Sequence, residues 1–220
     1  MFKKYLNPDS RIYHFFETAW NLILVNLLTL LCSIPIITVG ASLSAMYDVL
    51  LRIRRKEEGV IHRGFFASFR RNFVQATILW VMFALVFLSF AVDYRFTVLY
   101  PETFPVPVRY VVITAAFLVF MVFLYVFPLQ SHFENSIFMT IRNAAILSFS
   151  KIFRTIPMAL VWVIPWAILN FSVPLMPLVL MLGISFPAYV GVCPYDKTFR
   201  LLEENQSAAE METKMETENE

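Results

Sequence analysis

The chain has 220 residues, of which 59% are hydrophobic and only 15% are charged, and its mean hydropathy is +0.66. Soluble domains carry about 25% charged residues, so this composition excludes an ordinary soluble protein and indicates one that lies in a membrane. The net charge is +2. No basic, aromatic-interleaved soluble module is present, and the sequence therefore gives no case for nucleic acid as a partner.

The first long apolar stretch runs from Thr18 to Leu51 and contains one charge, Asp48. A helix needs roughly 20 apolar residues to cross a bilayer, so this stretch is either one long span or a hairpin of two. Pro35 disfavours helix at the residue before it. Thr38 or Ser42 has a side chain suited to capping a second helix.

A basic segment, 52–71, follows this stretch and orients the chain. Its seven bases place it in the cytoplasm by the positive-inside rule. The N-terminal tail also carries bases, Lys3, Lys4 and Arg11. If both segments are cytoplasmic, an even number of crossings separates them. This favours a hairpin with arms near 17–34 and 38–54, and a re-entrant hairpin is the alternative.

Three further stretches carry no Asp, Glu, Lys or Arg: Phe73–Val92, Tyr110–Phe133 and Thr155–Tyr195. The third is long enough for two helices. Polar residues and two prolines within 170–177 interrupt it, which predicts spans of about 156–171 and 175–193. The fold class is therefore an all-α transmembrane bundle of about six helices, with five as the alternative.

A six-helix arrangement puts both termini in the cytoplasm and leaves only Arg95 and Arg109 outside, in a proline-rich loop over 93–108. Sixteen of the eighteen bases are then cytoplasmic. Residues 1–203 form a single transmembrane domain. Residues 204–220 are acidic and polar, which predicts a disordered cytoplasmic tail.

Two cytoplasmic segments have the pattern of amphipathic helices that lie in the headgroup plane. One covers 63–73, and the other covers 137–154, where Arg142, Lys151 and Arg154 alternate with apolar residues. The first is the candidate surface for contact with a partner or with lipid, and it comprises Arg63, Phe65, Phe66, Phe69, Arg70, Arg71, Asn72 and Phe73.

The sequence has none of the usual catalytic or nucleotide-binding signatures, such as a Walker loop, HExxH or GxSxG. We therefore predict a protein that is not an enzyme, with no catalytic residue, no cofactor and no metal site. The three histidines, His14, His62 and His132, lie in three separate segments.

Two polar residues inside the apolar stretches are candidate intramembrane sites. Asp48 lies four residues before Arg52, and an i,i+4 ion pair near the cytoplasmic end of the helix explains it more simply than a proton or cation site does. Asn26 has the character of a hydrogen-bonding contact between helices, with a role in solute binding as the alternative.

Three blocks of sequence carry a family resemblance. They are Asn26-Leu27-Leu28 with 32–42, Glu57-Glu58-Gly59 with 65–77, and Phe127-Pro128-Leu129 with 133–136 and 141–144. Over roughly residues 2–203 the chain resembles the YesL-like family of integral membrane proteins of Gram-positive bacteria. The resemblance implies a place in the bacterial cell membrane and an association with carbohydrate uptake and breakdown.

These observations lead to two functional expectations. The first is a non-enzymatic accessory or assembly component of carbohydrate ABC uptake, whose partners are membrane lipids and ABC permease subunits. The alternative is a stand-alone solute transporter, because broken helices such as those at Pro35 and Pro174 occur at transport sites.

Overall fold

A computed structural model describes residues 11–199 apart from 58, 134, 172, 193, 194, 197 and 198. The described residues form helices and turns, with no strand among them, which confirms the all-helical fold class. The elements are α1 (Arg11–Cys32), η2 (Ile36–Thr38), α2 (Val39–Arg55), α3 (Ile61–Leu99), α4 (Val106–His132), α5 (Ile137–Ser150), α6 (Ile152–Phe171), η3 (Val173–Leu175) and α7 (Met176–Leu182). A further helical run covers 185–192. The predicted tail, 204–220, lies outside the described residues.

The first apolar stretch forms two helices, as the hairpin interpretation predicts. α1 ends at Cys32, and the chain passes through Pro35 in an extended conformation before α2 begins. Thr38 is the N-terminal flanking residue of α2, but its side chain does not cap that helix. Its hydroxyl instead donates to the carbonyl oxygens of Cys32 (2.6 Å) and Pro35 (2.7 Å). Thr38 thus gives a partner to the carbonyl of Cys32, one of those that the end of α1 leaves without a helical partner.

α2 and α3 approach each other closely at Gly40. A Cβ atom at this position would collide with the carbonyl oxygen of Ala76 and lie 2.6 Å from Cβ of Trp80. Only a residue without a side chain allows the two backbones to come this near. The contact fixes how α2 lies along α3, and therefore which of their side chains meet further along the pair.

α3 is one continuous helix of 39 residues, about 58 Å long at 1.5 Å per residue. The hydrocarbon core of a bilayer is about 30 Å thick, so α3 is much longer than one crossing needs. The amphipathic segment 63–73 is helical and belongs to the same continuous helix as the charge-free segment that follows it. The predicted loop over 93–108 is too long, because α3 extends to Leu99 and α4 begins at Val106.

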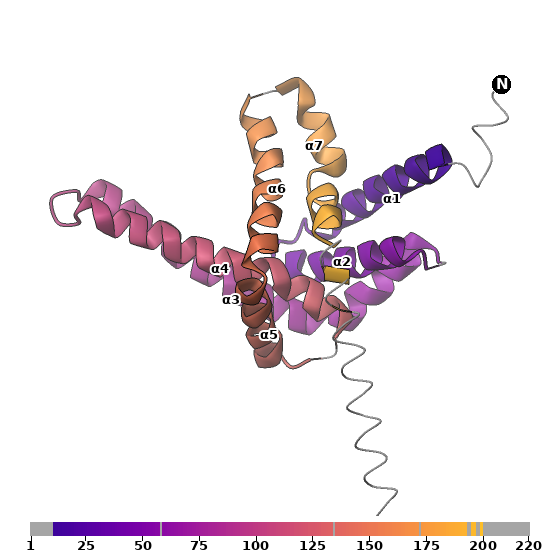
Figure 1. Cartoon of the computed structure of the whole chain (residues 1–220), viewed down its shortest axis with the longest axis horizontal. Coiled ribbons are helices and arrows are strands. Elements are labelled where there is room, and N and C mark those ends of the chain that lie inside the picture. The colour runs from indigo at the N-terminus through magenta and orange to yellow at the C-terminus, as the bar shows by residue number, and fades with distance from the viewer. Residues whose placement is uncertain are drawn as a thin grey trace, which may run out of the picture.

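The second amphipathic segment does form a helix of its own. α5 and α6 meet at a bend of 101° around Lys151, so α5 leads into α6 from a different direction. α6 and α7 are joined by η3, which lies within the predicted break at 170–177. In Figure 1 the α6–α7 hairpin rises to the top of the view, and the α3–α4 hairpin projects to the left.

By length and composition, four described helices can each cross a membrane: Ile12–Cys32, Ile36–Arg55, Ile61–Leu99 and Val106–His132. The bent pair of α5 and α6 adds a fifth if it forms one broken span. The chain is therefore a multi-pass membrane protein. The count of six includes a span over 175–193, where the structure has the seven-residue α7 and the separate run 185–192, and six crossings remain a prediction.

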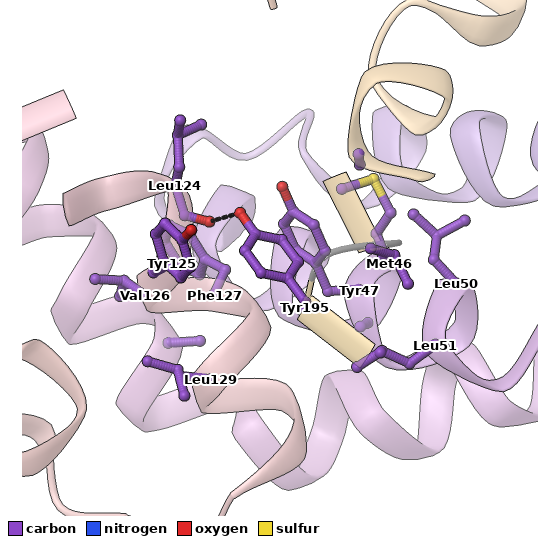
Figure 2. Close-up of a cluster of buried hydrophobic side chains, with 14 of the residues drawn as sticks. Met46, Tyr47, Leu50, Leu51, Leu124, Tyr125, Val126, Phe127, Leu129 and Tyr195 are labelled. Atoms are coloured by element: carbon purple, nitrogen blue, oxygen red, sulfur yellow. Dashed lines mark hydrogen bonds between the residues drawn. The ribbon is translucent and has the colours of Figure 1, made fainter. Parts of the chain in front are cut away.

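The core lies where α2, α3 and α4 meet and is closed by residues near the C-terminal end of the described chain. Pro128 has no N–H, so the carbonyl of Leu124, four residues earlier in α4, lacks its helical partner. The hydroxyl of Tyr195 donates to that carbonyl oxygen at 2.7 Å. Figure 2 shows Tyr195 between Tyr125 of α4 and Tyr47 of α2. Its ring packs edge-on against both, with centroids 4.9 Å and 6.2 Å apart.

Candidate functional site

The eight residues predicted to form one contact surface on α3 divide between two sides of the helix. Arg63, Phe66, Arg70 and Phe73 are exposed and lie within about 80° of one another around the helix axis, at 100° per residue. We call these four residues the α3 stripe. They lie on the turns at which the charge-free segment of α3 begins.

Three of the other predicted contact residues belong to the interior. Phe65 is fully buried, and Asn72 is buried with its amide donating to the hydroxyl of Ser68 at 3.3 Å. Phe69 is half-buried and stacks on Phe65. Phe65 and Asn72 thus pack in the interior and lie apart from the exposed side chains of the α3 stripe.

Arg71 is also not part of the α3 stripe. Its guanidinium reaches towards α2 and α4, where Nη2 donates to the carbonyl oxygen of Ser131 at 3.1 Å and lies 3.6 Å from Oδ1 of Asp48. Arg71 therefore joins three helices at one point. The sequence does not reveal this contact, because it depends on how α2, α3 and α4 pack.

Asp48 is buried, with 9% of its side chain exposed, and it lies between two arginines. The predicted pair with Arg52 is present, with Oδ2 3.1 Å from Nη2. This is an ion-pair distance, but the angles do not make a hydrogen bond, so Oδ2 has no hydrogen-bond partner within the described structure. The second arginine, Arg71, approaches the other carboxylate oxygen.

A polar cavity with a volume of about 200 Å³ opens beside Asp48. We call it the arginine pocket. It is lined by Asp48, Leu51, Arg52, Arg55, Glu57, Arg71, Ser131 and His132.

Residues from the C-terminal part of the described chain form one side of this region. Asp196 pairs with Arg55, with Oδ1 2.9 Å from Nε, and both side chains are largely buried. The ring of Phe199 stacks on that of His132, with centroids 5.4 Å apart.

Burial raises the pKa of the Tyr195 hydroxyl well above its usual range, and the neighbouring tyrosines Tyr47 and Tyr125 add to this shift. Tyr195 thus stays protonated and can keep donating to Leu124.

A chain of hydrogen-bonded polar side chains connects α3, α4 and α5. The amide of Gln130 donates to the side-chain oxygen of Gln75 at 2.6 Å, and the hydroxyl of Thr140 donates to the side-chain oxygen of Gln130 at 3.2 Å. The hydroxyl also donates to the carbonyl of Ser136. These bonds hold the start of α5 against α3 and α4, close to the arginine pocket.

Asn26, the other candidate intramembrane residue, is fully buried and bridges α1 to α7 and to the residues that follow it. Its amide donates to the carbonyl of Leu180 at 2.7 Å, and its side-chain oxygen accepts from the backbone N–H groups of Ile184 (3.0 Å) and Ser185 (2.9 Å). The helix is interrupted at 183–184, and Asn26 satisfies the backbone groups there. Asn26 is thus a structural contact between helices.

No group of three or more His, Cys, Asp or Glu side chains in the described part of the chain is placed to hold a metal ion. The chemistry that the described residues offer is recognition by arginine and carboxylate groups, at the arginine pocket, and by arginine and aromatic groups, at the α3 stripe.

Residues 22–94 are similar to a protein family described as "Protein of unknown function, DUF624". This match spans about a third of the chain and includes Asn26, Asp48, Arg71 and the α3 stripe. No curated protein and no solved structure matches the chain.

Proposed function

We propose that the protein is a non-enzymatic accessory or assembly component of a membrane transport system, and that the α3 stripe is its contact surface for partner subunits at the cytoplasmic face. One observation supports this most strongly. Two arginines and two phenylalanines share one exposed side of a helix that extends beyond the length of a span.

The composition of the stripe favours a protein partner over the membrane surface alone. Attraction to anionic lipid requires only positive charge, whereas protein interfaces are enriched in arginine and aromatic residues. Phe66 is 46% exposed and Phe73 is 37% exposed, so each leaves apolar area that a partner would cover. The identity of the partner as ABC permease subunits of carbohydrate uptake comes from the YesL-like resemblance.

The test is recovery of permease subunits when the full chain is purified from its own membrane in mild detergent. A variant with Arg63→Lys and Arg70→Lys keeps the charge but loses the planar guanidinium groups. We expect it to insert normally and to recover less partner, and Phe66→Ala with Phe73→Ala should have the same effect.

The control is Arg54→Lys, which makes the same exchange at an exposed arginine of α2 outside the stripe. It should behave like the unaltered protein. If the Lys variant of the stripe recovers as much partner as the unaltered protein, while the matching Gln variant inserts incorrectly, the stripe is an electrostatic anchor and the docking proposal is wrong.

The alternative, a stand-alone solute transporter, is favoured by the helix interruption at 183–184. Discontinuous helices commonly lie at transport sites. Here, however, Asn26 occupies the two N–H groups that a solute would use. Flux of a solute into vesicles that contain only this protein would establish the alternative, and Asn26→Leu should then change that flux.

A further inference from the structure

The turn between α1 and α2 exposes large apolar side chains. Ile34, Ile36 and Ile37 are 74%, 76% and 63% exposed. The turn between α2 and α3 is different, because it carries the charged residues Lys56 and Glu57. The three isoleucines form an apolar surface that no other described residue covers, and we call it the isoleucine tip.

Contacts between α2 and α3 show how deep this tip lies. Asp48, in the second half of α2, lies 3.6 Å from Arg71, whereas Gly40, in the first turn of α2, lies against Ala76 and Trp80. The two helices therefore run in opposite directions. η2, which contains part of the tip, also packs against α3. The isoleucine tip is thus level with Trp80 or with the next turn of α3 beyond it.

The charge-free segment Phe73–Val92 of α3 indicates where the bilayer lies. Arg71 and Asp93 flank this segment. Its length is about 30 Å at 1.5 Å per residue, which matches the hydrocarbon core of a bilayer. Trp80 lies about 10 Å from the first end of the segment and about 18 Å from the end next to Asp93. The isoleucine tip therefore ends near the middle of the hydrocarbon core.

The backbone of the turn is hydrogen-bonded within the chain. Lipid hydrocarbon offers no partner to backbone polar groups, so a turn inside it must satisfy them internally. The N–H group of Ser33 donates to the carbonyl oxygen of Thr29 at 3.0 Å, and that of Thr38 donates to Pro35 at 2.8 Å. The Thr38 hydroxyl donates to the carbonyl oxygen of Cys32 at 2.6 Å. Pro35 has no N–H group to satisfy.

We infer that the isoleucine tip is a contact surface for lipid acyl chains and that α1 and α2 form a re-entrant hairpin. Such a hairpin enters and leaves the membrane on the side of the basic segment 52–71. It contributes no crossing, so the predicted number of crossings falls by two and remains even. The inference does not rest on the proposed docking function, because the α3 stripe takes no part in it.

The experiment places a nitroxide spin label on a single cysteine at Ile36. The full chain, with Cys32 and Cys193 replaced by serine, is reconstituted in phosphatidylcholine vesicles. The rates at which the label collides with molecular oxygen, which dissolves in hydrocarbon, and with a water-soluble nickel chelate report its surroundings. We expect frequent collisions with oxygen and rare collisions with nickel.

Two further labels calibrate the measurement. Leu85 is 62% exposed and lies near the middle of the charge-free segment of α3, so a label there is the matched control for contact with lipid. A label at Thr103, in the turn between α3 and α4, is the control for water. The ratio of oxygen to nickel collisions at Ile36 should equal that at Leu85 and lie well above that at Thr103.

Two outcomes would overturn the inference. Frequent nickel collisions at Ile36, as at Thr103, would show that the tip is in water, because the two arms cross the bilayer or because a water-filled space opens there. Rare collisions with both reagents would show that protein, and not lipid, covers the tip. A label at Ile37, on the same tip, takes the place of the label at Ile36 if that variant does not fold.

A pair of charge variants tests the same inference through insertion. Ile36→Asp puts a carboxylate in the hydrocarbon, where a charged group is costly. Phe104→Asp makes the same exchange of an apolar residue in the turn between α3 and α4, which lies in water. We expect Ile36→Asp to lose most of the membrane-inserted protein and Phe104→Asp to lose little of it. Equal yields of the two variants would contradict the re-entrant hairpin.

Discussion

The hydroxyl of Tyr195 donates to the carbonyl oxygen of Leu124, the one carbonyl in α4 that Pro128 deprives of its helical partner. A residue near the end of the described chain thus completes a helix that begins 89 positions earlier, at Val106. Because α4 lies in the core, the bond joins the C-terminal region to the centre of the fold.

We expect Tyr195→Phe to lower the free energy of unfolding by about 1–3 kcal/mol, because it leaves the buried Leu124 carbonyl without a donor. Tyr125→Phe should cost less, because Thr155, the partner of Tyr125, also donates to the carbonyls of Ser148 and Lys151. Unfolding in detergent, followed by circular dichroism, measures both changes.

A double-mutant cycle tests the mechanism of this effect. Pro128→Ala restores an N–H that can bond to Leu124 within the helix. In that background Tyr195→Phe should cost clearly less than it does alone. An equal cost in both backgrounds would show that the Tyr195 hydroxyl matters for a reason other than the orphaned carbonyl.

Gly40 should tolerate no larger residue. We expect Gly40→Ala to destabilise the protein by about 1–3 kcal/mol, the usual cost of overpacking, because its Cβ atom would meet backbone of α3 at Ala76. Gly64→Ala is the matched control in α3, since its Cβ atom would lie 3.9 Å from Val49, an ordinary contact. That change should be neutral or slightly stabilising. Thermal unfolding of the two variants in the same detergent checks the difference, and equal behaviour would contradict the close approach of α2 and α3.

Asn26→Leu keeps the approximate volume of the side chain but leaves three backbone groups without partners at the interruption after α7. We expect a loss of about 1–3 kcal/mol and faster proteolysis between α7 and the run 185–192. Asn21→Leu is the control, because Asn21 is half-buried in the same helix and makes no hydrogen bond within the described residues. Equal losses would mean that the polar bridge to Leu180, Ile184 and Ser185 contributes nothing of its own.

Local signals in the sequence predicted the features that depend on a few neighbouring residues. Pro35 indicated the end of α1, the prolines within 170–177 indicated the turn before α7, and the spacing of Asp48 and Arg52 indicated their ion pair. The length of α3 also had a signal, because neither glycine nor proline occurs between Gly64 and Pro101. The basic charge of this segment suggested an interfacial helix instead.

The contacts that build the arginine pocket had no such local signal. Arg71 meets Asp48 only because Gly40 lets α2 lie close along α3, and Arg55 meets Asp196 across 141 positions. The division of the predicted surface into the α3 stripe and buried residues has the same origin. Phe65 and Phe66 are adjacent in sequence and identical in chemistry, and only the position of α2 and α4 determines that Phe65 is buried.

The predicted membrane topology places both termini on the same side. We expect an even number of crossings with both ends in the cytoplasm, because sixteen of eighteen bases then lie on that side. Single cysteines at Lys4 and Asn205, in a background where Cys32 and Cys193 are replaced by serine, should resist an impermeant thiol reagent in intact cells. A cysteine at Thr103, in the turn between α3 and α4, should react and serves as the positive control. Reaction at Lys4 but not at Asn205 would instead establish an odd number of crossings. The first apolar stretch would then cross the membrane once, and α1 and α2 would be two parts of a single bent span.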